Sequence, residues 1–586
     1  MALGRSGLDT MTGMGAADAA LARIESSEQD AAAVADRAKA TELVRRAIKL
    51  WRRGEVARTA KMALRATEVD PSYGAAFHML ALALEKMGHL HKALVTYEQA
   101  YALDPEDSDL LLNLGLTAWG LKMYTSAADM FAQYIARRPD SPLGYNNLGS
   151  VLCDLGDVPQ AIETLRTAIY RMPHEAALWN SLATVLSEQG RAEEALVFYK
   201  EAIALDPGYS RPWHNLAFAL SHLGQLEDSL EAYDEALARA VDPVDLLEGR
   251  HSRSICLIGM GRLEEGFHEY EVRNEPSFRA YVRYMVDAPQ WQGEALEGKR
   301  LLVIGEQGLG DEIMFASVLP DLSRVLGGTG QLMIAVDPRL VSLFQRSFPK
   351  AIVGPYEDRK FVDGDDRKEF RFIPFAADDQ RPDFFVPMAS AMQFTRRRSE
   401  DFPKNAFLMP EPARVAQLRA RLLGLGPGPF VGICWRSMMQ DIKRNKYFSP
   451  LLQWEPILRT HGVQFVNLQY GDCDGELAEV FARYQVPVHR LEGLDLKEDI
   501  DGVAALCAAL DLVLSAPTAA AATAGSVGTE TWILTAGRTW PQLGTSCYPW
   551  YRAAPVFHPQ NFGDWEKLLP DVAAALTGFA ARLRAA

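Results

Sequence analysis

Apolar and polar residues in the N-terminal half of the chain alternate at helical spacing, and the whole pattern repeats every 34 residues. Within each period, apolar residues recur three and four positions apart, and a glycine near the middle divides the period into two short helices. Prolines, leucines, small residues and large apolar residues recur at fixed places. They are Pro71, Pro105, Pro139, Pro173 and Pro207; Leu80, Leu114, Leu148, Leu182 and Leu216; Ala81, Gly115, Gly149, Ala183 and Ala217; and Tyr97, Phe131, Leu165, Tyr199 and Tyr233. The pattern predicts six helical repeats from about 40 to 243 and a degenerate seventh that runs through Arg273.

The period also indicates the type of repeat. Paired short helices that recur every 34 residues are typical of tetratricopeptide repeats. In such a repeat the proline ends the second helix, and the small residues allow close packing of the helices. One repeat has Lys122 where the others have the dividing glycine. We therefore expect a flexible segment at 1–39 and a superhelix with a long concave groove over 40–279.

One further position in the repeats can be interpreted in two ways. The residue before each recurring leucine is polar in four of five repeats, and in this type of repeat that position faces the groove. A row of amides there can hydrogen-bond the backbone of an extended peptide. Alternatively, the same residues suit a position where helices pack. The predicted partner-binding residues are Asn113, Asn147, Ser181 and Asn215.

The second half of the chain has a different pattern, in which buried strands alternate with helices. Strands are predicted at 300–305, 331–337, near 370, and at 429–435, 463–470, 510–516 and 530–536. Such alternation is typical of doubly wound parallel sheets. The glycine-rich stretch 424–429 is the best hinge candidate. We predict a connector at 280–298, a first Rossmann-like domain at 299–425, a second at 426–560, and a C-terminal helix at 561–586 that packs on the first domain.

A glycine-rich turn follows the first predicted strand, at residues 305–310. This layout usually holds a phosphate, yet the turn and the following residues are acidic, and no lysine or arginine occurs between Gly305 and Pro320. The glycine spacing matches neither a dinucleotide-binding fingerprint nor a P-loop. Asp311 lies near the start of the next helix. It is either a helix cap or a general base that faces a ligand.

The second predicted domain carries the opposite charge. A basic segment follows the strand at 429–435, and it is either a solvated loop or a phosphate clamp. A helix of small residues follows the strand at 510–516, and its N-terminus is either an anion site or a packing feature. The predicted nucleotide-binding residues are Gly308, Gly310, Arg436, Lys443, Arg444, Lys446, Gln469, Tyr470, Pro517, Thr518, Thr523 and Gly525.

Composition narrows the class of protein. The formal charge of −15 argues against a general nucleic-acid binder. Six scattered cysteines without paired spacing indicate neither a disulfide framework nor a zinc site. The first 37 residues lack the apolar core of a signal peptide, and no segment has 18 uninterrupted apolar residues, so no membrane span is expected. We expect a cytoplasmic protein.

Residues 291–316, "WQGEALEGKRLLVIGEQGLGDEIMFA", resemble a known group. Together with the repeats, they resemble bacterial glycosyltransferases with tetratricopeptide repeats and a GT-B fold. The catalytic half is similar to lipopolysaccharide heptosyltransferases, and the layout is similar to that of O-GlcNAc transferase. Within the group, the similarity is greatest to flagellin glycosyltransferases of alphaproteobacteria. The resemblance implies an α-solenoid followed by two Rossmann-like domains that face a cleft.

The resemblance also implies roles for individual residues. Asp311 matches the proposed catalytic base, and Arg436 with the basic cluster matches the residues assigned to the donor phosphate. The loop read as V-D-T-x-x-x-H in the relatives has Pro517 in place of the aspartate and Ala522 in place of the histidine. This departure fits a donor other than ADP-heptose, such as a CMP-linked nonulosonic acid. The implied acceptor is a serine or threonine of flagellin, and the implied co-substrate is a nucleotide sugar, with no metal and no further cofactor.

Two other functions remain open from the sequence. The lost aspartate and histidine would suit an adaptor whose α/β half binds a nucleotide sugar without turning it over. Alternatively, the acceptor is a glycan or a lipid, and the repeats serve only assembly. Donor hydrolysis would separate an enzyme from an adaptor, and deletion of the repeats would test their role in binding the acceptor.

Overall fold

The computed structural model describes residues 33–363, 366–376, 380–403, 405–438, 442–552 and 554–585. The chain forms two compact units. One contains the described residues up to Leu216 together with Ala238–Leu246 and Lys360–Glu369, and the other contains Ala217–Leu237, Leu247–Arg359 and Phe370 onward. Of the predicted flexible segment 1–39, residues 1–32 lie outside the described residues, whereas Ala33 onward is already helical.

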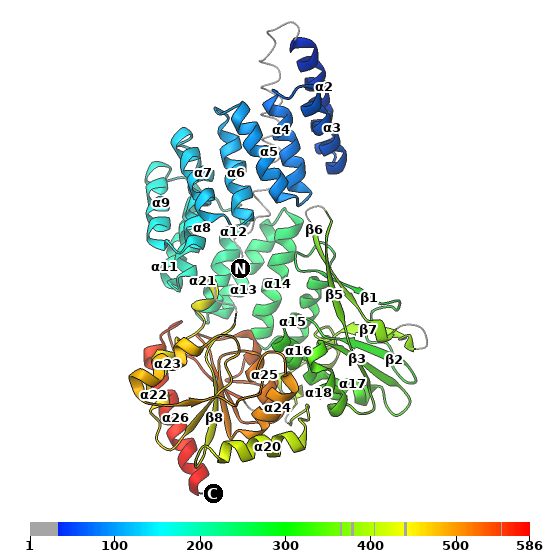
Figure 1. Cartoon of the computed structure of the whole chain (residues 1–586), viewed down its shortest axis with the longest axis vertical. Coiled ribbons are helices and arrows are strands. Elements are labelled where there is room, and N and C mark those ends of the chain that lie inside the picture. The colour runs from blue at the N-terminus through cyan, green and yellow to red at the C-terminus, as the bar shows by residue number, and fades with distance from the viewer. Residues whose placement is uncertain are drawn as a thin grey trace. The chain divides into compact units, whose positions relative to one another are not determined.

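The first unit is built from antiparallel helical pairs, and the predicted tetratricopeptide repeats are confirmed. Five pairs lie side by side in it, coloured blue to cyan in Figure 1. A sixth pair, α12 and α13, is divided between the units. The pairs are α2 (Ala33–Trp51) with α3 (Val56–Val69), α4 (Gly74–Lys86) with α5 (Leu90–Leu103), α6 (Ser108–Gly120) with α7 (Tyr124–Arg137), α8 (Pro142–Leu155) with α9 (Val158–Arg171), α10 (Ala176–Glu188) with α11 (Ala192–Leu205), and α12 (Ser210–His222) with α13 (Leu226–Arg239).

The turn inside each pair explains the glycine register. Gly54, Gly88, Gly156 and Gly190 all have positive φ angles, between 72° and 88°, which a residue without a Cβ adopts readily. Lys122, the one exception in the sequence, adopts the same left-handed conformation with φ of 62°. The turn geometry is therefore kept even where the glycine is lost.

The small-residue register is where the helices of a pair approach most closely. A Cβ added to Gly115 would lie 2.5 Å from Cε1 of Phe131, and one added to Gly149 would lie 3.0 Å from the Leu165 side chain. The large register residues fill this space, since Tyr97, Phe131 and Leu165 are fully buried. The core of each pair thus comes from a small residue facing a large one.

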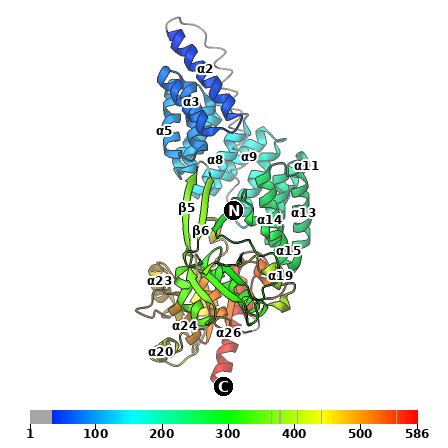
Figure 2. The same ribbon diagram turned by 90° about the vertical axis from the view of Figure 1, so that its right-hand side faces the viewer.

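The second unit begins with helices from the end of the repeats. Helices α13, α14 (Pro243–Gly259) and α15 (Leu263–Tyr270) lie side by side in both views (Figures 1 and 2). The short helix η1 (Glu271–Asn274) follows α15 directly. From Leu247 onward, the degenerate seventh repeat therefore belongs to the unit that also contains the α/β region.

The first parallel sheet has four strands in the order β4-β3-β2-β7. All its pairings are parallel, as predicted from the alternating pattern. Its strands are β2 (Arg300–Ile304), β3 (Gln331–Val336), β4 (Ile352–Pro355) and β7 (Phe384–Pro387). Its helical segments are α16 (Leu309–Phe315), η2 (Ala316–Val318), α17 (Leu319–Val325), η3 (Pro338–Leu340), α18 (Val341–Ser347), η4 (Pro374–Ala376), α19 (Met392–Thr395) and η6 (Ser399–Asp401).

The second sheet has seven strands in the order β10-β9-β8-β11-β12-β14-β13, parallel except for β13. Its strands are β8 (Phe430–Cys434), β9 (Gln464–Asn467), β10 (Val488–His489), β11 (Leu512–Ser515), β12 (Thr531–Leu534), β13 (Cys547–Tyr548) and β14 (Ala554–Phe557). Its helical segments are α20 (Pro412–Leu423), α21 (Ile442–Asn445), η7 (Leu451–Trp454), α22 (Glu455–Leu458), α23 (Asp474–Tyr484), α24 (Ile500–Ala509), α25 (Ala519–Ser526), η8 (Trp540–Gln542) and α26 (Trp565–Ala585).

Two helices differ from their predicted positions. The C-terminal helix α26 was expected on the first domain, but its apolar side chains share a core with β8, β12 and α22 of the second sheet. Helix α20, which precedes the predicted hinge, packs against α24 and shares a core with Phe430 of the second sheet. The chain therefore passes from the first sheet to the second before Pro412, rather than at 424–429. Sequence periodicity gives the apolar face of a helix but not the sheet that the face covers.

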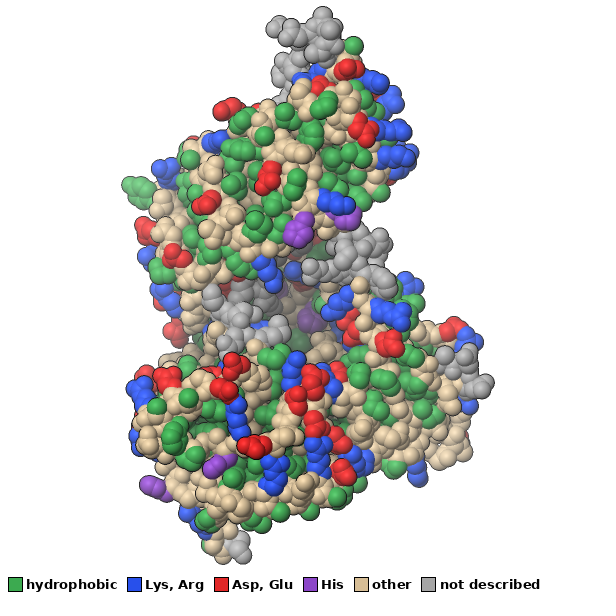
Figure 3. Space-filling model, in the orientation of Figure 1, with side chains coloured by type: hydrophobic (Ala, Val, Ile, Leu, Met, Phe, Trp, Pro, Cys, Tyr) green, Lys and Arg blue, Asp and Glu red, His purple; other side chains and the backbone are tan. Residues whose placement is uncertain are grey.

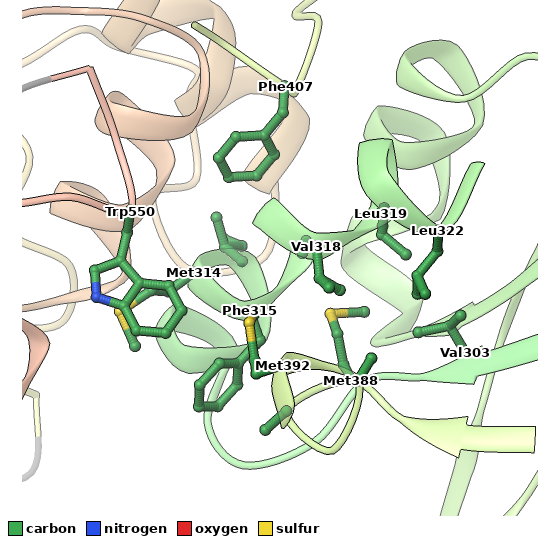
Figure 4. Packing of buried hydrophobic residues seen from close by; sticks show 14 of the residues in the cluster. Val303, Met314, Phe315, Val318, Leu319, Leu322, Met388, Met392, Phe407 and Trp550 are labelled. Atoms are coloured by element: carbon green, nitrogen blue, oxygen red, sulfur yellow. The ribbon is translucent and has the colours of Figure 1, made fainter. Parts of the chain in front are cut away.

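A single apolar core joins the two sheets. Figure 4 shows Trp550, from the chain between β13 and β14, beside Met314 and Phe315 of α16. The rings of Phe315 and Trp550 meet edge to face with centroids 5.7 Å apart. The α/β region is therefore one packed body, in which α16 is buried between the sheets.

A third sheet of three strands has the order β1-β6-β5, with β1 (Val282–Met285), β5 (Glu357–Asp363) and β6 (Asp366–Phe372).

On the visible face of the second unit, acidic and basic side chains lie next to one another over α18 and α24 (Figure 3). One such pair joins Arg346 and Asp501 at 2.7 Å. Among the described residues, no helix combines the length and apolar character needed to cross a membrane.

Candidate functional site

The strand order marks one point in each parallel sheet where a ligand is expected. From β2 the chain continues to β3 and β4 on one side and returns to β7 on the other, and from β8 it continues to β9 and β10 before returning to β11. Ligands of doubly wound sheets bind at the carboxyl ends of the strands where the order reverses. The relevant places are therefore the ends of β2 and β7, and the ends of β8 and β11.

The first of these places is filled by an ion pair. Glu306, directly after β2, is buried and accepts hydrogen bonds from Arg273 Nε and Nη2, both at 2.9 Å. Its Oε1 atom also accepts from the backbone amide of Ala389, after β7, at 2.7 Å. Arg273 comes from η1 at the end of the repeats. One of the three acids in the predicted loop is thus a structural group.

A second acid of the loop is also structural. Glu312 is fully buried and accepts hydrogen bonds from the Asp337 backbone amide at 2.8 Å and from the Tyr356 hydroxyl at 2.9 Å. Burial raises the pKa of Glu312 to about 7, although these two hydrogen bonds oppose the shift. The side chain joins α16 to the ends of β3 and β4, which fixes the start of the helix.

The third acid, Asp311, is half-buried. The helix α16 begins after Gly308, so Asp311 is the third residue of the helix and not its cap, and its carboxylate accepts a hydrogen bond from the Gly308 backbone amide. Burial raises the pKa of Asp311, and the nearby Glu306 carboxylate raises it further. Asp311 is therefore not the N-cap residue, but its carboxylate does satisfy the backbone amide of the N-cap residue Gly308.

Asp311 lies where α16 meets the second sheet. Helices α16 and α25 pack against each other, and a Cβ on Gly310 would lie only 3.2 Å from the backbone nitrogen of Ala519, the first residue of α25. The Asp311 charge acts on three buried tyrosines, Tyr270, Tyr548 and Tyr551. The acidic loop and the N-terminus of α25 therefore form one site.

At the second place of reversal, polar groups from three strands meet. Thr518 is the residue before α25, and its hydroxyl lies 3.2 Å from Ser515 Oγ and 3.5 Å from Cys434 Sγ at the end of β8. Gln469, after β9, accepts hydrogen bonds from the backbone amides of Trp435 and Arg436. The carboxyl ends of β9, β8 and β11 are thus linked side by side.

Arg436, the first predicted phosphate ligand, faces α23 in this structure. Its Nε donates to Glu476 Oε2 at 3.0 Å, its Nη2 also contacts that carboxylate, and its Nη2 donates to the Asp472 carbonyl at 2.9 Å. The Trp435 indole donates to the same Glu476 at 2.8 Å. A phosphate bound by Arg436 would have to share or replace Glu476.

The rest of the basic segment lies near the last full repeat. Lys446 lies 5.4 Å from the ring centroid of Tyr447, whose hydroxyl is 2.8 Å from Nε2 of His222 in α12. Arg444 is exposed. The side chain of Lys443 lies outside the described residues.

Comparison with known proteins connects both halves of the chain. Models of the tetratricopeptide repeat match residues 78–142, 141–207 and 186–247. Protein FlbA of Caulobacter vibrioides is 41% identical over 563 residues, which cover 96% of this chain and 93% of that protein. The chain belongs to the FlbA family. Two solved structures are also similar: TTC0263, a thermophilic repeat protein of Thermus thermophilus, is 25% identical with a TM-score of 0.28 and covers 30% of this chain and 96% of its own. YrrB is 22% identical with a TM-score of 0.24 and covers 33% of this chain and 98% of its own.

Several predicted donor ligands of this FlbA-family chain are packing residues. Thr523 donates its hydroxyl to the Ala519 carbonyl within α25, and a Cβ on Gly525 would overlap the ring of Tyr551. Gln469 is buried, and its amide also donates to the Tyr470 carbonyl. Pro517 is exposed, and Thr518, Tyr470 and Gly310 are half-buried, so these remain within reach of a ligand.

The predicted partner-binding amides lie between neighbouring repeats. Asn113 is buried, and its Nδ2 lies 3.0 Å from Nε2 of His78, while Asn215 Nδ2 donates to Asn180 Oδ1 at 3.0 Å. Asn147 is also buried, and its Nδ2 has no hydrogen-bond partner in the described structure. Ser181 is half-buried. Two of the four amide positions thus serve repeat-to-repeat contacts, which supports the packing interpretation for them.

The sequence interpretation missed two groups at the site. Arg273 and the tyrosines Tyr270, Tyr548 and Tyr551 come from outside the strand-and-turn segments. Within the described ranges, no group of three or more His, Cys, Asp or Glu side chains could hold a metal.

Proposed function

We propose that this chain is a protein O-glycosyltransferase with a GT-B-like catalytic half. It transfers a sugar from a nucleotide-sugar donor to a serine or threonine of a protein held by the repeats, with flagellin as the acceptor. The observation that carries the proposal is the position of Asp311. Asp311 is half-buried and the pKa of its carboxyl is raised, and the preceding residue, Gly310, lies against the N-terminus of α25 at the carboxyl edge of the second sheet.

In this mechanism Asp311 is the general base. It accepts the proton of the acceptor hydroxyl, the hydroxyl oxygen bonds to the anomeric carbon, and the bond from that carbon to the donor phosphate breaks. The nucleotide leaves with the electron pair. Burial of Asp311 raises its pKa, which makes its carboxylate a stronger base than an exposed aspartate.

The donor phosphate belongs on the second sheet. Thr518 and the first amides of α25 supply an N-terminal helix dipole for an anion. Arg436, Arg444 and Lys446 supply positive charge, and their attraction grows as charge builds on the leaving phosphate. A CMP-linked nonulosonic acid is the donor we expect, because Pro517 and Ala522 stand where ADP-heptose enzymes have an aspartate and a histidine.

The repeats deliver the acceptor. Tetratricopeptide arrays bind proteins, and tethering a substrate to the chain that carries the catalytic half raises its local concentration even when its affinity is modest. Of the four predicted partner-binding positions, the half-buried Ser181 is the one we assign to contact with a bound chain. We therefore assign acceptor choice to the repeats and the chemistry to the α/β half.

Intact mass spectrometry of the acceptor tests the proposal. Purified flagellin is incubated with the full chain and CMP-linked nonulosonic acid, and the mass of one or more sugar residues should be added. The Asp311→Asn variant should lose at least about a hundredfold in rate. The control variant Asp571→Asn removes an exposed carboxylate in α26 and should keep the wild-type rate. Equal rates for wild type and Asp311→Asn would refute the assignment of the base.

A second candidate is an adaptor that binds a nucleotide sugar without transfer. The contact between Arg436 and Glu476 favours it, because this guanidinium already has a carboxylate partner. Slow donor hydrolysis separates the two functions. An enzyme hydrolyses the donor faster than its Asp311→Asn variant does, whereas an adaptor shows no difference between them.

A further inference from the structure

We propose that Arg273, in the short helix η1 at the end of the seventh repeat, is a positioning residue for Asp311. By pairing with Glu306, Arg273 holds the loop 305–311 in the conformation that presents Asp311 and balances the charge beside it. This inference rests on the proposed function, because it assigns the reaction to Asp311. In this role, the end of the seventh repeat supports the loop that carries Asp311.

Arg273 is held on all sides. Its Nη1 donates to the Tyr270 carbonyl at 3.0 Å and to Glu271 Oε1 at 2.8 Å, and its Nη2 donates to Ser390 Oγ at 2.8 Å in addition to Glu306. A planar guanidinium with these partners has one orientation. Glu306 is fixed in turn, because it also accepts the Ala389 amide after β7. The pair therefore locks the end of β2 to the end of β7.

The residues from Glu306 to Asp311 transmit this position. Gln307 has a φ of 66°, a left-handed conformation that a residue with a Cβ keeps only when its neighbours hold it. Its amide Nε2 lies 3.4 Å from the hydroxyl of Tyr270, three residues before Arg273. Gly308 then caps α16, and its amide meets the Asp311 carboxylate. The end of the seventh repeat thus contacts the loop at two successive residues, Glu306 and Gln307.

The ion pair of Arg273 and Glu306 also sets the charge near Asp311. The groups that face this carboxyl are Glu306 from its own loop, Tyr270 from α15, and Tyr548 and Tyr551 from the chain after β12. Of these, Glu306 is the charged one, and its carboxylate raises the pKa of Asp311. Arg273 neutralises Glu306 directly. Removing either partner should therefore move the titration of Asp311, and in opposite directions.

Carbodiimide labelling measures this titration without an activity assay. Carbodiimides react with protonated carboxyls, and trypsin releases residues 301–324 as one peptide whose labelled positions mass spectrometry can assign. The full chain is labelled at several pH values in the presence of an amine. In Glu306→Gln, the midpoint for Asp311 should fall by about one pH unit. In Arg273→Met, labelling of the peptide should persist to higher pH, because two carboxyls then share the site without a cation.

Two further variants separate position and charge from a general loss of structure. The double variant Arg273→Met with Glu306→Gln removes both charges, so its midpoint should return toward the wild-type value and lie above that of Glu306→Gln. This comparison does not require Arg273→Met alone to fold. The control Glu265→Gln, in α15, breaks an exposed ion pair with Arg262 and should leave the midpoint of Asp311 unchanged.

The outcomes discriminate between this inference and the proposed function. An unchanged midpoint in folded Glu306→Gln, or equal midpoints in Glu306→Gln and the double variant, would refute a role for Arg273 beyond packing. Shifted midpoints together with no sugar transfer by the wild type would refute the proposed function and retain Arg273 as the residue that positions Asp311. Shifted midpoints together with a matching shift of the acidic limb of the transfer rate would support both.

Discussion

The hydroxyl of Tyr447 lies 2.8 Å from Nε2 of His222, and this contact ties the basic segment of the second sheet to the last full repeat. Burial lowers the pKa of His222 to about 4, so its ring is neutral near pH 7. Since Nδ1 lies 2.8 Å from the Phe218 carbonyl, Nδ1 carries the proton and Nε2 accepts from Tyr447. Phe562 packs edge to face on both rings.

We predict that Tyr447→Phe loosens the segment that carries Arg444 and Lys446. The variant keeps the ring and loses one hydrogen bond, which is worth about 1 kcal/mol, so local opening should increase roughly fivefold. Limited trypsin digestion of the native protein measures this, because cleavage after Arg444 and Lys446 should accelerate by that factor. Tyr170→Phe, at an exposed tyrosine of α9, is the control and should not change these cleavages. Unchanged cleavage in Tyr447→Phe would show that the contact does not hold the segment.

A second prediction concerns Glu312 and pH. Its pKa rises from 4.5 to about 7 on folding, so the folded state binds more protons than the unfolded state between these values. Its contribution to stability is therefore present in full below about pH 4.5 and is lost as the pH rises to 7. The neutral variant Glu312→Gln should exceed the wild type by roughly 2 kcal/mol in free energy of unfolding at pH 8, and match it at pH 5.

Urea unfolding of both proteins at pH 5 and pH 8 provides this measurement. Glu264→Gln, at an exposed position of α15, is the matched control and should follow the wild type at both values. If Glu312→Gln is the less stable protein at pH 8, then the hydrogen bonds to Asp337 and Tyr356 need a carboxylate. That result would contradict the prediction.

The local features of this fold could be read from the sequence. The 34-residue register holds because each marker acts within one helical pair, as Gly115 and Phe131 do. The central strands were predicted because their apolar runs are continuous, whereas β10, with two residues, carries too little pattern to be seen. The direction in which α26 packs depends on the whole sheet and could not be predicted from its own periodicity.

The site was harder to predict because its contacts join distant residues. The sequence singled out Asp311 in the acidic glycine-rich turn but gave no role to Glu306 and Glu312. Arg273 and Tyr356 hold these two acids from 33 residues before and 44 residues after them. The amide row was read as a binding surface, but Asn113 contacts His78 in the preceding repeat. Polar residues that recur regularly can bind a partner or bind each other, and only the three-dimensional structure distinguishes these cases.

The glycines of the turn lead to a third prediction. A Cβ on Gly305 would overlap the Glu312 carboxyl, which cannot move because Asp337 and Tyr356 hold it. Gly305→Ala should therefore lower the free energy of unfolding by at least about 2 kcal/mol. Gly328→Ala, where no heavy atom lies within 4 Å of the added methyl group, is the control and should be nearly neutral. Thermal unfolding of the two variants compares them, and equal midpoints would mean that Glu312 has more freedom than its contacts indicate.

The last prediction tests the small-against-large packing of the repeats. Gly115→Ala would bring a methyl group to 2.5 Å from Phe131, and overpacking of this kind destabilises by about 1–3 kcal/mol. Other repeats carry Ala81 against Tyr97 and Ala183 against Tyr199, so the register accepts alanine where the helices are spaced for it. Gly115→Ala should be partly rescued by Phe131→Leu, since leucine faces a glycine at Leu165 and Gly149.

A double-mutant cycle on urea unfolding measures this coupling. Gly74→Ala, whose added methyl group would meet its neighbours at an ordinary 3.5 Å, is the matched helical control and should be neutral or slightly stabilising. A positive coupling free energy of about 1 kcal/mol between positions 115 and 131 is expected. Strict additivity of the two substitutions would mean that α6 and α7 separate to admit the methyl group, and that the close approach at Gly115 is not a constraint on this repeat.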